Sequence, residues 1–449
     1  MQVIIVFALI FWFGYLVSLL VNPDDNPLEK CGLSYLLGSG LFTFILFIFS
    51  LLGIKIDTSS IFILLIGLII LLSIILGDKK RSLLHDLKNL KKSYLHLSPM
   101  EKLVGVFISG FILVSLVSTL YWPVNEWDAL ALYDFRAKVI TSTGYFAQVA
   151  GNYPYFAHYP LLTSLLHAIV YISKGNNPQF VYSLQFLSFV MIFGATLRKF
   201  ASRRASLLAT LLVVSNPILL RHSTISYTNL PYSIYLVLGM IYLYLSMKKQ
   251  NIRYLVLSGL LVGLSTWTRD VEPFWLTGIA VIVIYAFWKR KFLYPFFYAI
   301  PFFAIQLPWR YLMVKLFGKS RGITDQLSGA AVELVQRADI GRIKEILVFI
   351  YQSVIVSWGY LFPFFIVLIL LGLIRKTKLS IDMFLLIIGI NFGILIAGTY
   401  LFSINYVGWN HIPDSALRMA MFFIPLIIFY IGYSDIFARA ADILFFHKR

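Results

Sequence analysis

Long stretches without charged residues alternate along this chain with short connections rich in lysine and arginine. About 20 residues of α-helix cross the hydrocarbon core of a bilayer, and runs of this order recur throughout the sequence. The predicted spans cover approximately residues 3–21, 33–53, 61–77, 103–122, 178–197, 205–221, 231–247, 254–268, 273–288, 292–316, 346–374, 383–403 and 419–436. The pattern therefore predicts an all-α membrane protein, a polytopic bundle of about 13 transmembrane helices with interfacial helices on its outer face.

The composition agrees with a membrane location. Of the 449 residues, 59% are hydrophobic and 13% charged, with a mean hydropathy of +0.83, whereas soluble domains carry about 25% charged residues. A net charge of +18 would suit nucleic acid, but the basic residues lie between the spans, where membrane topology and anionic lipid explain them. We therefore expect membrane lipids and no nucleic acid among the partners. The single cysteine, Cys31, excludes an intrachain disulfide.

The basic connections predict the topology. Six clusters are expected to face the cytoplasm, because lysine and arginine are enriched in cytoplasmic loops. They lie within residues 79–92, 198–204, 248–253, 289–291, 375–378 and 439–449. The apolar segment 160–173 has only 14 residues, which is short for a span. All six clusters lie on the same side of the membrane only if this segment does not cross and stays at the outer face. We then expect a multi-pass plasma-membrane protein with its N-terminus outside and its C-terminus in the cytoplasm.

This topology suggests two parts. Residues 1–102 hold three N-terminal spans and a basic cytoplasmic loop, and residues 103–449 form a core with an extracytoplasmic loop at 123–177. That loop contains a polar segment, 125–138, which reads Asn-Glu-Trp-Asp-Ala-Leu-Ala-Leu-Tyr-Asp-Phe-Arg-Ala-Lys, and a second one at 153–162. Charged residues close to a bilayer are costly and are therefore functional candidates. The remaining outer polar segments are 221–229, 269–272, 317–345 and 405–418.

The carboxylates of segment 125–138 are candidates for acid–base chemistry. Asp128 follows a predicted span directly and is our preferred general base, although an Asp at this position also commonly caps a following helix. Glu126 can share the site, but residues i and i+2 do not face each other on a helix. Asp134 is the second candidate base. Its spacing of four residues from Lys138 is also that of an ordinary ion pair on a helix.

The outer cations are candidates for binding an anion. Arg418 is the preferred phosphate ligand, because it begins a predicted span from the outer side, where helix N-terminal amides favour an anion. Anchoring at the membrane interface is the alternative. Two roles fit Arg136 and Lys138 equally: they bind phosphate, or they extend towards lipid headgroups. Arg269 is expected to pair with Asp270 or Glu272.

Other outer residues complete the list of candidates for substrate binding. His158 can donate a hydrogen bond to phosphate or hold a structural position beside the tyrosines that flank it, whereas His167 lies in an apolar segment and is expected to be packed. Trp127 and Trp409 can stack on sugar faces or anchor at the interface. The substrate-binding candidates are Glu126, Arg136, Lys138, His158, Tyr159, Arg221, Asn229, Arg269 and Arg418.

Four segments together resemble the GT-C superfold glycosyltransferases, in particular the protein O-mannosyltransferases and the lipid A aminoarabinose transferases. Asp128 followed by the amphipathic stretch and by His158-Tyr159-Pro-Leu-Leu resembles the first outer loop of that family. Residues 217–231 resemble its second outer turn, and residues 263–269, Gly-Leu-Ser-Thr-Trp-Thr-Arg, a conserved span end. Residues 415–418, Ser-Ala-Leu-Arg, resemble a late loop whose arginine contacts phosphate. The likeness covers roughly residues 100–436.

The resemblance implies transfer of a sugar from a polyprenyl-phosphate donor to a protein, lipid or glycan acceptor on the outer face. Attack by an acceptor hydroxyl in a single displacement would invert the anomeric carbon, with Asp128 as base and Arg418 at the phosphate. Two positions depart from the family pattern. Asn229 stands where an Asp is common, which counts against a two-carboxylate or metal-dependent scheme, although a divalent metal ion stays open as a cofactor. His158-Tyr159 replaces a Lys-containing motif.

Two other classes of function stay open. A ligase or polymerase of cell-surface glycans would use the same basic outer site with a diphosphate-linked donor. A transporter or lipid flippase would place charged residues near the middle of the membrane on broken helices. The sequence contains no HExxH, CxxC, P-loop or GxSxG motif, so protease, redox, NTPase and hydrolase functions lack their usual signatures.

Overall fold

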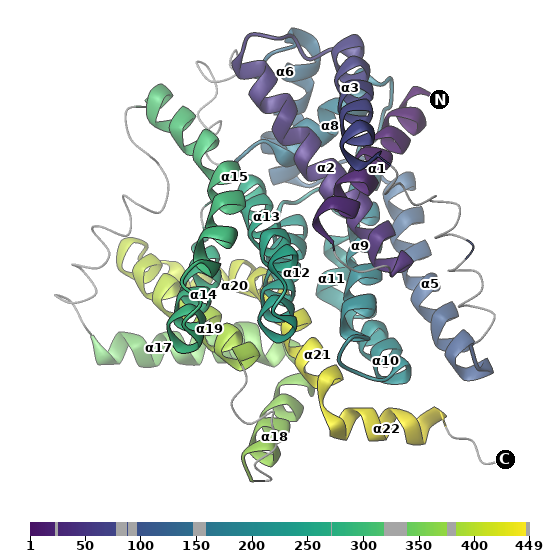
Figure 1. Cartoon of the computed structure of the whole chain (residues 1–449). Helices are drawn as coiled ribbons and strands as arrows, with labels where there is room; N and C mark the ends of the chain where they lie inside the picture. Colours follow the sequence, from purple (N-terminus) through teal and green to yellow (C-terminus); the bar gives the residue numbers. More distant parts are fainter. Residues whose placement is uncertain are drawn as a thin grey trace.

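The computed structural model describes residues 1–22, 26–77, 88, 97–146, 159–270, 272–317, 339–374 and 383–445. All regular elements in these ranges are helices, and the chain is an all-α polytopic membrane protein (Figure 1). The longer helices are α1 (Gln2–Val21), α2 (Pro27–Leu51), α3 (Thr58–Leu76), α5 (Pro99–Tyr121), α6 (Phe135–Thr143), α8 (Leu162–Ile172), α9 (Phe180–Leu197), α10 (Arg203–Val214), α12 (Asn229–Lys249), α13 (Ile252–Thr268), α14 (Trp275–Lys289), α15 (Tyr294–Phe317), α17 (Ile340–Ile350), α18 (Leu361–Ile374), α19 (Met383–Asn405), α21 (Ile424–Tyr433) and α22 (Asp435–Phe445). Shorter elements are η2 (Ala129–Asp134), α11 (Pro217–His222), η4 (Tyr351–Ile355), η5 (Val356–Trp358), η6 (Trp409–His411), α20 (Pro413–Met419) and η7 (Ala420–Phe422).

Among the described residues, fewer helices than the predicted thirteen are both long enough and apolar enough to cross a bilayer unaided. Within the described ranges, eight segments meet the requirements of length and hydropathy, or nine if one bent pair counts as a span. Seven are single helices: α1, α2, α3, α5, α9, α12 and α19. The eighth is the stretch Pro413–Tyr433, which includes α20, η7 and α21. Helices α13 and α14 are apolar but have only 17 and 15 residues.

The segment predicted as one span over residues 346–374 is not a single straight helix. The helical segment Ile340–Trp358, which contains α17, η4 and η5, meets α18 at an angle of 95°. The break falls at Gly359, whose φ of +56° is readily adopted only by glycine. One side of α17 packs inward through Ile346 and Ile350, while the charged Lys344 and Glu345 are exposed. Such an amphipathic helix is typical of the membrane interface.

The short apolar segment predicted not to cross the membrane forms α8. Its 11 residues are too few for a span, as expected from the sequence. However, α8 does not lie at a lipid interface, because every residue from Leu162 to Val170 is buried. It packs against α6, η2 and α2. The helix therefore supports the outer polar segment from inside the protein.

The three N-terminal helices pack into the same bundle as the rest of the chain. A Cβ atom added at Gly14 would lie 1.8 Å from the Ser34 carbonyl oxygen, so α1 and α2 are in close backbone contact. Helix α2 in turn packs on α9. At this contact the fully buried Glu29 carboxylate lies 2.8 Å from the Lys199 ammonium group and accepts a hydrogen bond of 2.6 Å from Tyr242.

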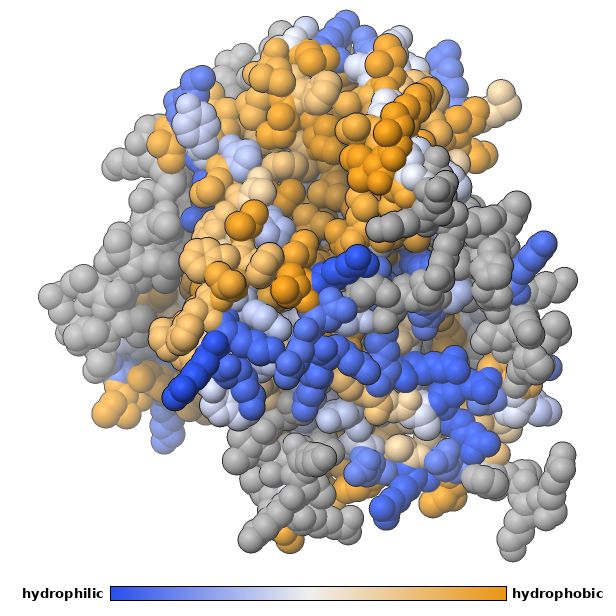
Figure 2. All heavy atoms as spheres, in the orientation of Figure 1, coloured by the Kyte–Doolittle hydropathy of each residue, from blue (hydrophilic) through white to orange (hydrophobic). Residues whose placement is uncertain are grey.

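Basic residues gather at one end of the bundle. Arg204 lies 3.2 Å from Asp442 of α22, and Lys291 donates a hydrogen bond of 2.8 Å to Gln250. Lys199 lies over the ring of Tyr254, next to Arg253. Figure 2 shows a hydrophilic band across the lower half of the molecule, with hydrophobic side chains above it. The predicted cytoplasmic clusters at 198–204, 248–253 and 289–291 are therefore neighbours, and α22 lies beside the first of them.

Candidate active site

The polar segment 125–138 forms a π-helix followed by an α-helix. Asp128 precedes η2, which continues directly into α6, and α6 ends at Gly144 with a φ of +81°. The Asp128 side chain makes no capping hydrogen bond to η2. The helix-capping role considered for this residue is therefore not realised, and the carboxylate is available for other contacts.

Asp128 and Arg418, the two leading candidates from the sequence, lie together. The Nη1 atom of Arg418 is 3.7 Å from the Oδ2 atom of Asp128, although the residues are 290 positions apart in the chain. The Nη2 atom of Arg418 is 2.8 Å from Asp414, one turn earlier on α20. The guanidinium also lies over the ring of Tyr227, 5.6 Å from its centre. Both charged side chains of the Asp128–Arg418 pair are partly exposed, at 36% and 22%.

The helix-terminus argument for Arg418 is wrong. Arg418 is the sixth residue of the stretch Pro413–Tyr433 and lies in the last turn of α20, beyond the four N-terminal amides that lack partners within a helix. Its capacity to bind an anion therefore rests on its own charge and its five N–H donors.

The charge of Arg418 affects two neighbouring side chains. Burial, and then the positive charges of Arg418 and Arg221, lower the pKa of His222 to about 4. This histidine is therefore neutral at physiological pH, with one nitrogen able to donate and the other to accept a hydrogen bond. Burial and the carboxylates of Asp128 and Glu126 raise the pKa of Tyr227, which stays a neutral hydroxyl. Glu126 and Arg221 thus act on the same site electrostatically.

The arginine at the end of α13 is already paired. The Nε atom of Arg269 lies 3.1 Å from Glu272, which confirms the predicted structural ion pair, and its Nη1 atom donates to the Thr228 hydroxyl at 3.2 Å. Its guanidinium lies over the ring of Tyr159, 4.8 Å from the centre. Asn229, the first residue of α12, is buried beside this contact. Since α12 ends at Lys249 in the basic band, the candidate site is at the opposite end of the bundle.

Asp134 is buried in a network of its own. Its carboxylate lies 2.8 Å from Lys138, which confirms the ion pair predicted at this spacing, and 3.2 Å from Nδ1 of His167; it also accepts from the Tyr171 hydroxyl. Burial alone would raise the pKa of Asp134, but the hydrogen bonds from His167, Lys138 and Tyr171 lower it to about 2. A carboxylate with so low a pKa and no exposure is a poor general base. This environment favours Asp128 over Asp134.

His167 and Arg136 also have structural partners. His167 is fully buried, as predicted, and its Nε2 atom is 3.1 Å from the Tyr182 hydroxyl. Arg136 is 1% exposed and donates to the carbonyl oxygens of Leu132, at 3.1 Å, and Tyr159, at 2.7 Å. Of the two roles considered for Arg136, neither phosphate binding nor lipid contact fits this position. His158 lies outside the described residues.

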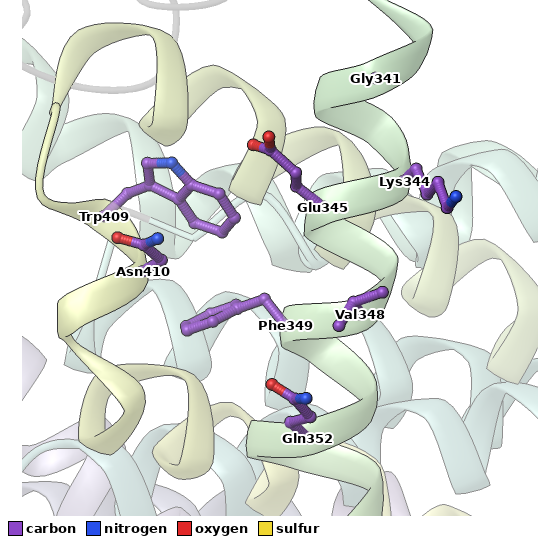
Figure 3. A pocket seen from close by; sticks show the side chains of 8 residues that line it. All are labelled: Gly341, Lys344, Glu345, Val348, Phe349, Gln352, Trp409 and Asn410. Carbon is purple, nitrogen blue, oxygen red and sulfur yellow. The ribbon is translucent and has the colours of Figure 1, made fainter.

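An open pocket of about 540 Å³ lies between α17 and η6, close to α20. Figure 3 shows Trp409 and Asn410 on one wall and Glu345, Phe349 and Gln352 on the other. The Trp409 ring packs edge-on against Phe349, with ring centres 5.0 Å apart. Amide and carboxylate groups beside aromatic rings suit a polar, hydroxyl-rich molecule. Asn410 is four residues from Asp414, so the pocket adjoins the Asp128–Arg418 pair along the chain.

Sequence reasoning missed several members of this end of the bundle. Tyr227 and Asp414 contact or influence Arg418, and both could have been found because they lie inside the outer segments 221–229 and 405–418. Asp270 accepts a hydrogen bond of 3.2 Å from Trp309 of α15, a pairing that no short-range pattern indicates. In the part of the chain that the structure describes, no three His, Cys, Asp or Glu side chains are grouped so that they could hold a metal ion.

The description of this site rests on the structure of this chain alone. The Asp128–Arg418 contact, the neutral His222 and the pocket at Trp409 are properties of the chain itself. Comparison with models of protein families, with curated proteins and with solved structures found no match to this chain.

Proposed function

We propose that this protein is an integral-membrane glycosyltransferase that transfers a sugar from a polyprenyl-phosphate donor to an acceptor on the extracytoplasmic face. The observation that carries the proposal is the contact between Asp128 and Arg418 at 3.7 Å. The two groups supply the two functions that the reaction needs. A carboxylate removes the proton from an attacking hydroxyl, and a guanidinium stabilises the negative charge on the departing phosphate.

The reaction follows as a single displacement. The acceptor oxygen bonds to the anomeric carbon while the bond from that carbon to the phosphate oxygen breaks, and the hydroxyl proton passes to Asp128. The electron pair of the broken bond stays on the phosphate, which Arg418 binds. Before the donor arrives, Arg418 is shared between Asp128 and Asp414. An incoming phosphate competes for the guanidinium and so leaves the Asp128 carboxylate free to accept the proton.

The neighbouring residues support this division of roles. Neutral His222 can donate a hydrogen bond to phosphate without adding a charge, and Arg221 increases the positive potential at this position. Glu126 lies within electrostatic reach of the same tyrosine as Asp128. The pocket at Trp409 and Asn410 provides a place for a hydroxyl-bearing acceptor next to α20.

The test uses purified protein in lipid nanodiscs with a panel of polyprenyl-phosphate sugars. Asp128→Asn should lower turnover by about 10²- to 10⁴-fold, the usual contribution of a general base, with donor binding retained. Asp442→Asn is the matched control, because it also removes an Asp paired with an arginine, 3.2 Å away, but at the basic end. Full activity of Asp128→Asn, or a product with retained anomeric configuration, would contradict the mechanism.

One structural feature favours a second candidate, transport of a lipid or glycan. The segment from α17 to α18 bends by 95° instead of forming one straight helix. Discontinuous helices are typical of transporters. An uptake assay in proteoliposomes separates the two functions, because a transferase modifies its substrate and a transporter delivers it unchanged. A glycan ligase with a diphosphate-linked donor would instead be detected in the donor panel.

A further inference from the structure

Helix α15 carries two polar side chains on the face that lies against α14. Gln306 is 4% exposed, and Arg310 follows it by four residues, so the two side chains are neighbours on one side of the helix. Arg310 is 16 residues from the start of α15, or roughly 24 Å along a helix of about 36 Å. In the predicted topology this position lies within the outer third of the membrane.

The polar atoms of this group are buried without partners. The Oε1 and Nε2 atoms of Gln306, the Nε and Nη2 atoms of Arg310 and the Nε1 atom of Trp275 make no hydrogen bond to any residue that the structure describes. Unpaired polar groups are rare in protein interiors, because desolvation opposes their burial. A charged residue within a predicted membrane span, here 292–316, is moreover a functional candidate by default.

These atoms belong to one contact between α14 and α15. The Arg310 guanidinium lies over the indole of Trp275, 5.6 Å from the ring centre, and Trp275 stacks on Phe302, one turn before Gln306, with ring centres 5.3 Å apart. The unpartnered groups provide N–H donors from three side chains and a single acceptor, the Gln306 oxygen. A donor-rich group that includes a guanidinium matches an anion with several acceptor oxygens.

The nearest acidic side chain does not neutralise this group. Asp270 attracts Arg310 electrostatically, but the hydrogen bond that it accepts, at 3.2 Å, comes from Trp309. Burial raises the pKa of Asp270 to about 6, which shows that its environment disfavours the charged form. Among the described residues, no ion pair joins Asp270 to Arg310.

The outside of α15 next to Arg310 is apolar and exposed. Leu307, Tyr311 and Val314 flank Arg310 and are among the exposed hydrophobic residues of the chain. Lipid chains would cover such a surface in a membrane, and Arg310 itself is only partly buried. A ligand that reaches the guanidinium from this side therefore combines an anionic head with an apolar tail.

We infer that Arg310, Gln306 and Trp275 form a binding site for the phosphate group of a membrane lipid, separate from the Asp128–Arg418 pair. The two sites are built from different elements, α14 and α15 in one case and η2 and α20 in the other. The lipid is either a bilayer phospholipid or a polyprenyl phosphate, since both present the same phosphate oxygens above an apolar chain. This site does not depend on the proposed sugar transfer and would serve a transporter equally.

The experiment measures lipid binding to the full chain by native mass spectrometry from a neutral detergent. Phosphatidylglycerol and undecaprenyl phosphate are titrated separately, with diacylglycerol as a lipid that lacks phosphate. Wild type should bind one or both phosphate lipids, and Arg310→Gln should weaken one binding event by roughly tenfold or more, the value expected for a lost charged hydrogen bond. Arg290→Gln, an exposed arginine at the end of α14 in the basic band, is the matched control and should bind as wild type.

Two further variants guard against misfolding. Gln306→Leu removes the amide while keeping the size and should weaken the same event, and Arg310→Lys keeps the charge but loses the planar fork, so its affinity should be intermediate. Each phosphate lipid that binds should also raise the thermal unfolding temperature of wild type more than that of Arg310→Gln. Preference for one phosphate lipid identifies the source of the phosphate. Equal binding by wild type and Arg310→Gln, or equal competition by diacylglycerol, would overturn the inference.

Discussion

Replacing Asp134 by asparagine should lower the stability of the fold, whereas replacing Asp128 by asparagine should lower turnover. Asp134 has a pKa of about 2 instead of the usual 3.8, a difference of just under two units. At 1.36 kcal/mol per unit, its ionised form contributes about 2 kcal/mol to the free energy of unfolding at neutral pH. The loss should not reach the roughly 3–5 kcal/mol typical of a broken buried pair, because the Lys138 side chain is 62% exposed and stays hydrated.

The effect of pH has a defined direction. Because the pKa of Asp134 is lower in the folded protein than in the unfolded chain, its contribution is complete above about pH 4 and is lost as the pH falls towards 2. Asp128→Asn should change the free energy of unfolding by only about 0–1 kcal/mol, because its pair with Arg418 is partly exposed.

The assay titrates sodium dodecyl sulfate into the protein in mild detergent micelles and follows unfolding by tryptophan fluorescence. Turnover of the donor is measured on the same samples. Asp134→Asn should lose stability and keep turnover per folded molecule, while Asp128→Asn should do the reverse. An Asp134→Asn variant of normal stability but without turnover would refute the assignment of the two carboxylates.

Three further substitutions test the packing and the electrostatics. Burial raises the pKa of Asp270 to about 6, so Asp270→Asn should stabilise the protein by about 2–3 kcal/mol at pH 7.5, and the gain should vanish below about pH 4, where the carboxyl is neutral in both states. A stability difference independent of pH would contradict this. Glu29→Gln breaks a buried pair and should cost about 3 kcal/mol in the same titration, whereas an unchanged midpoint would mean that the pair is not formed. Gly14→Ala should destabilise the protein by at least about 1 kcal/mol, because α1 and α2 must separate to make room for the methyl group. The control is Gly110→Ala, where an added Cβ atom has nothing within 4 Å and should not destabilise the protein. Similar effects of both glycine variants would argue against the close α1–α2 contact.

The sequence alone predicts that Asp128 and Arg418 lie on the same side of the membrane. Asp128 and Arg418 each border a predicted span. If all the basic loops lie on the cytoplasmic side, both of these span ends lie on the opposite side of the membrane and therefore at one end of the bundle. Their separation of 3.7 Å could not be predicted. It depends on the tertiary contact between α20 and the residue before η2, and helical periodicity contains no information about such a contact between remote segments.

The burial of individual charged side chains and the bend between α17 and α18 could not be predicted from the sequence. The pairing of Asp134 with Lys138 follows from local spacing, but the contact with His167 depends on α8 being enclosed by its neighbours. Arg136 looks like an exposed cation in the sequence, yet the bundle covers it. The bend within residues 346–374 was hidden for a different reason. Hydropathy measures whether a stretch is apolar and not whether it is straight, and the local signals of the 95° bend are Gly359 and Pro363.

The charged residues of the site differ in how much free energy it costs to separate them from their partners. Asp134, Arg136 and Arg269 are buried with fixed partners, and separating such groups costs several kcal/mol, so they hold η2 and α6 against α8 and α12. Asp128, Asp414 and Arg418 are also paired, but they remain partly exposed, and separating such pairs costs at most about 1 kcal/mol. These three can therefore exchange partners with a substrate at ordinary binding energies. The buried pairs therefore supply the rigidity that positions Asp128, and the exposed pairs supply the groups that react.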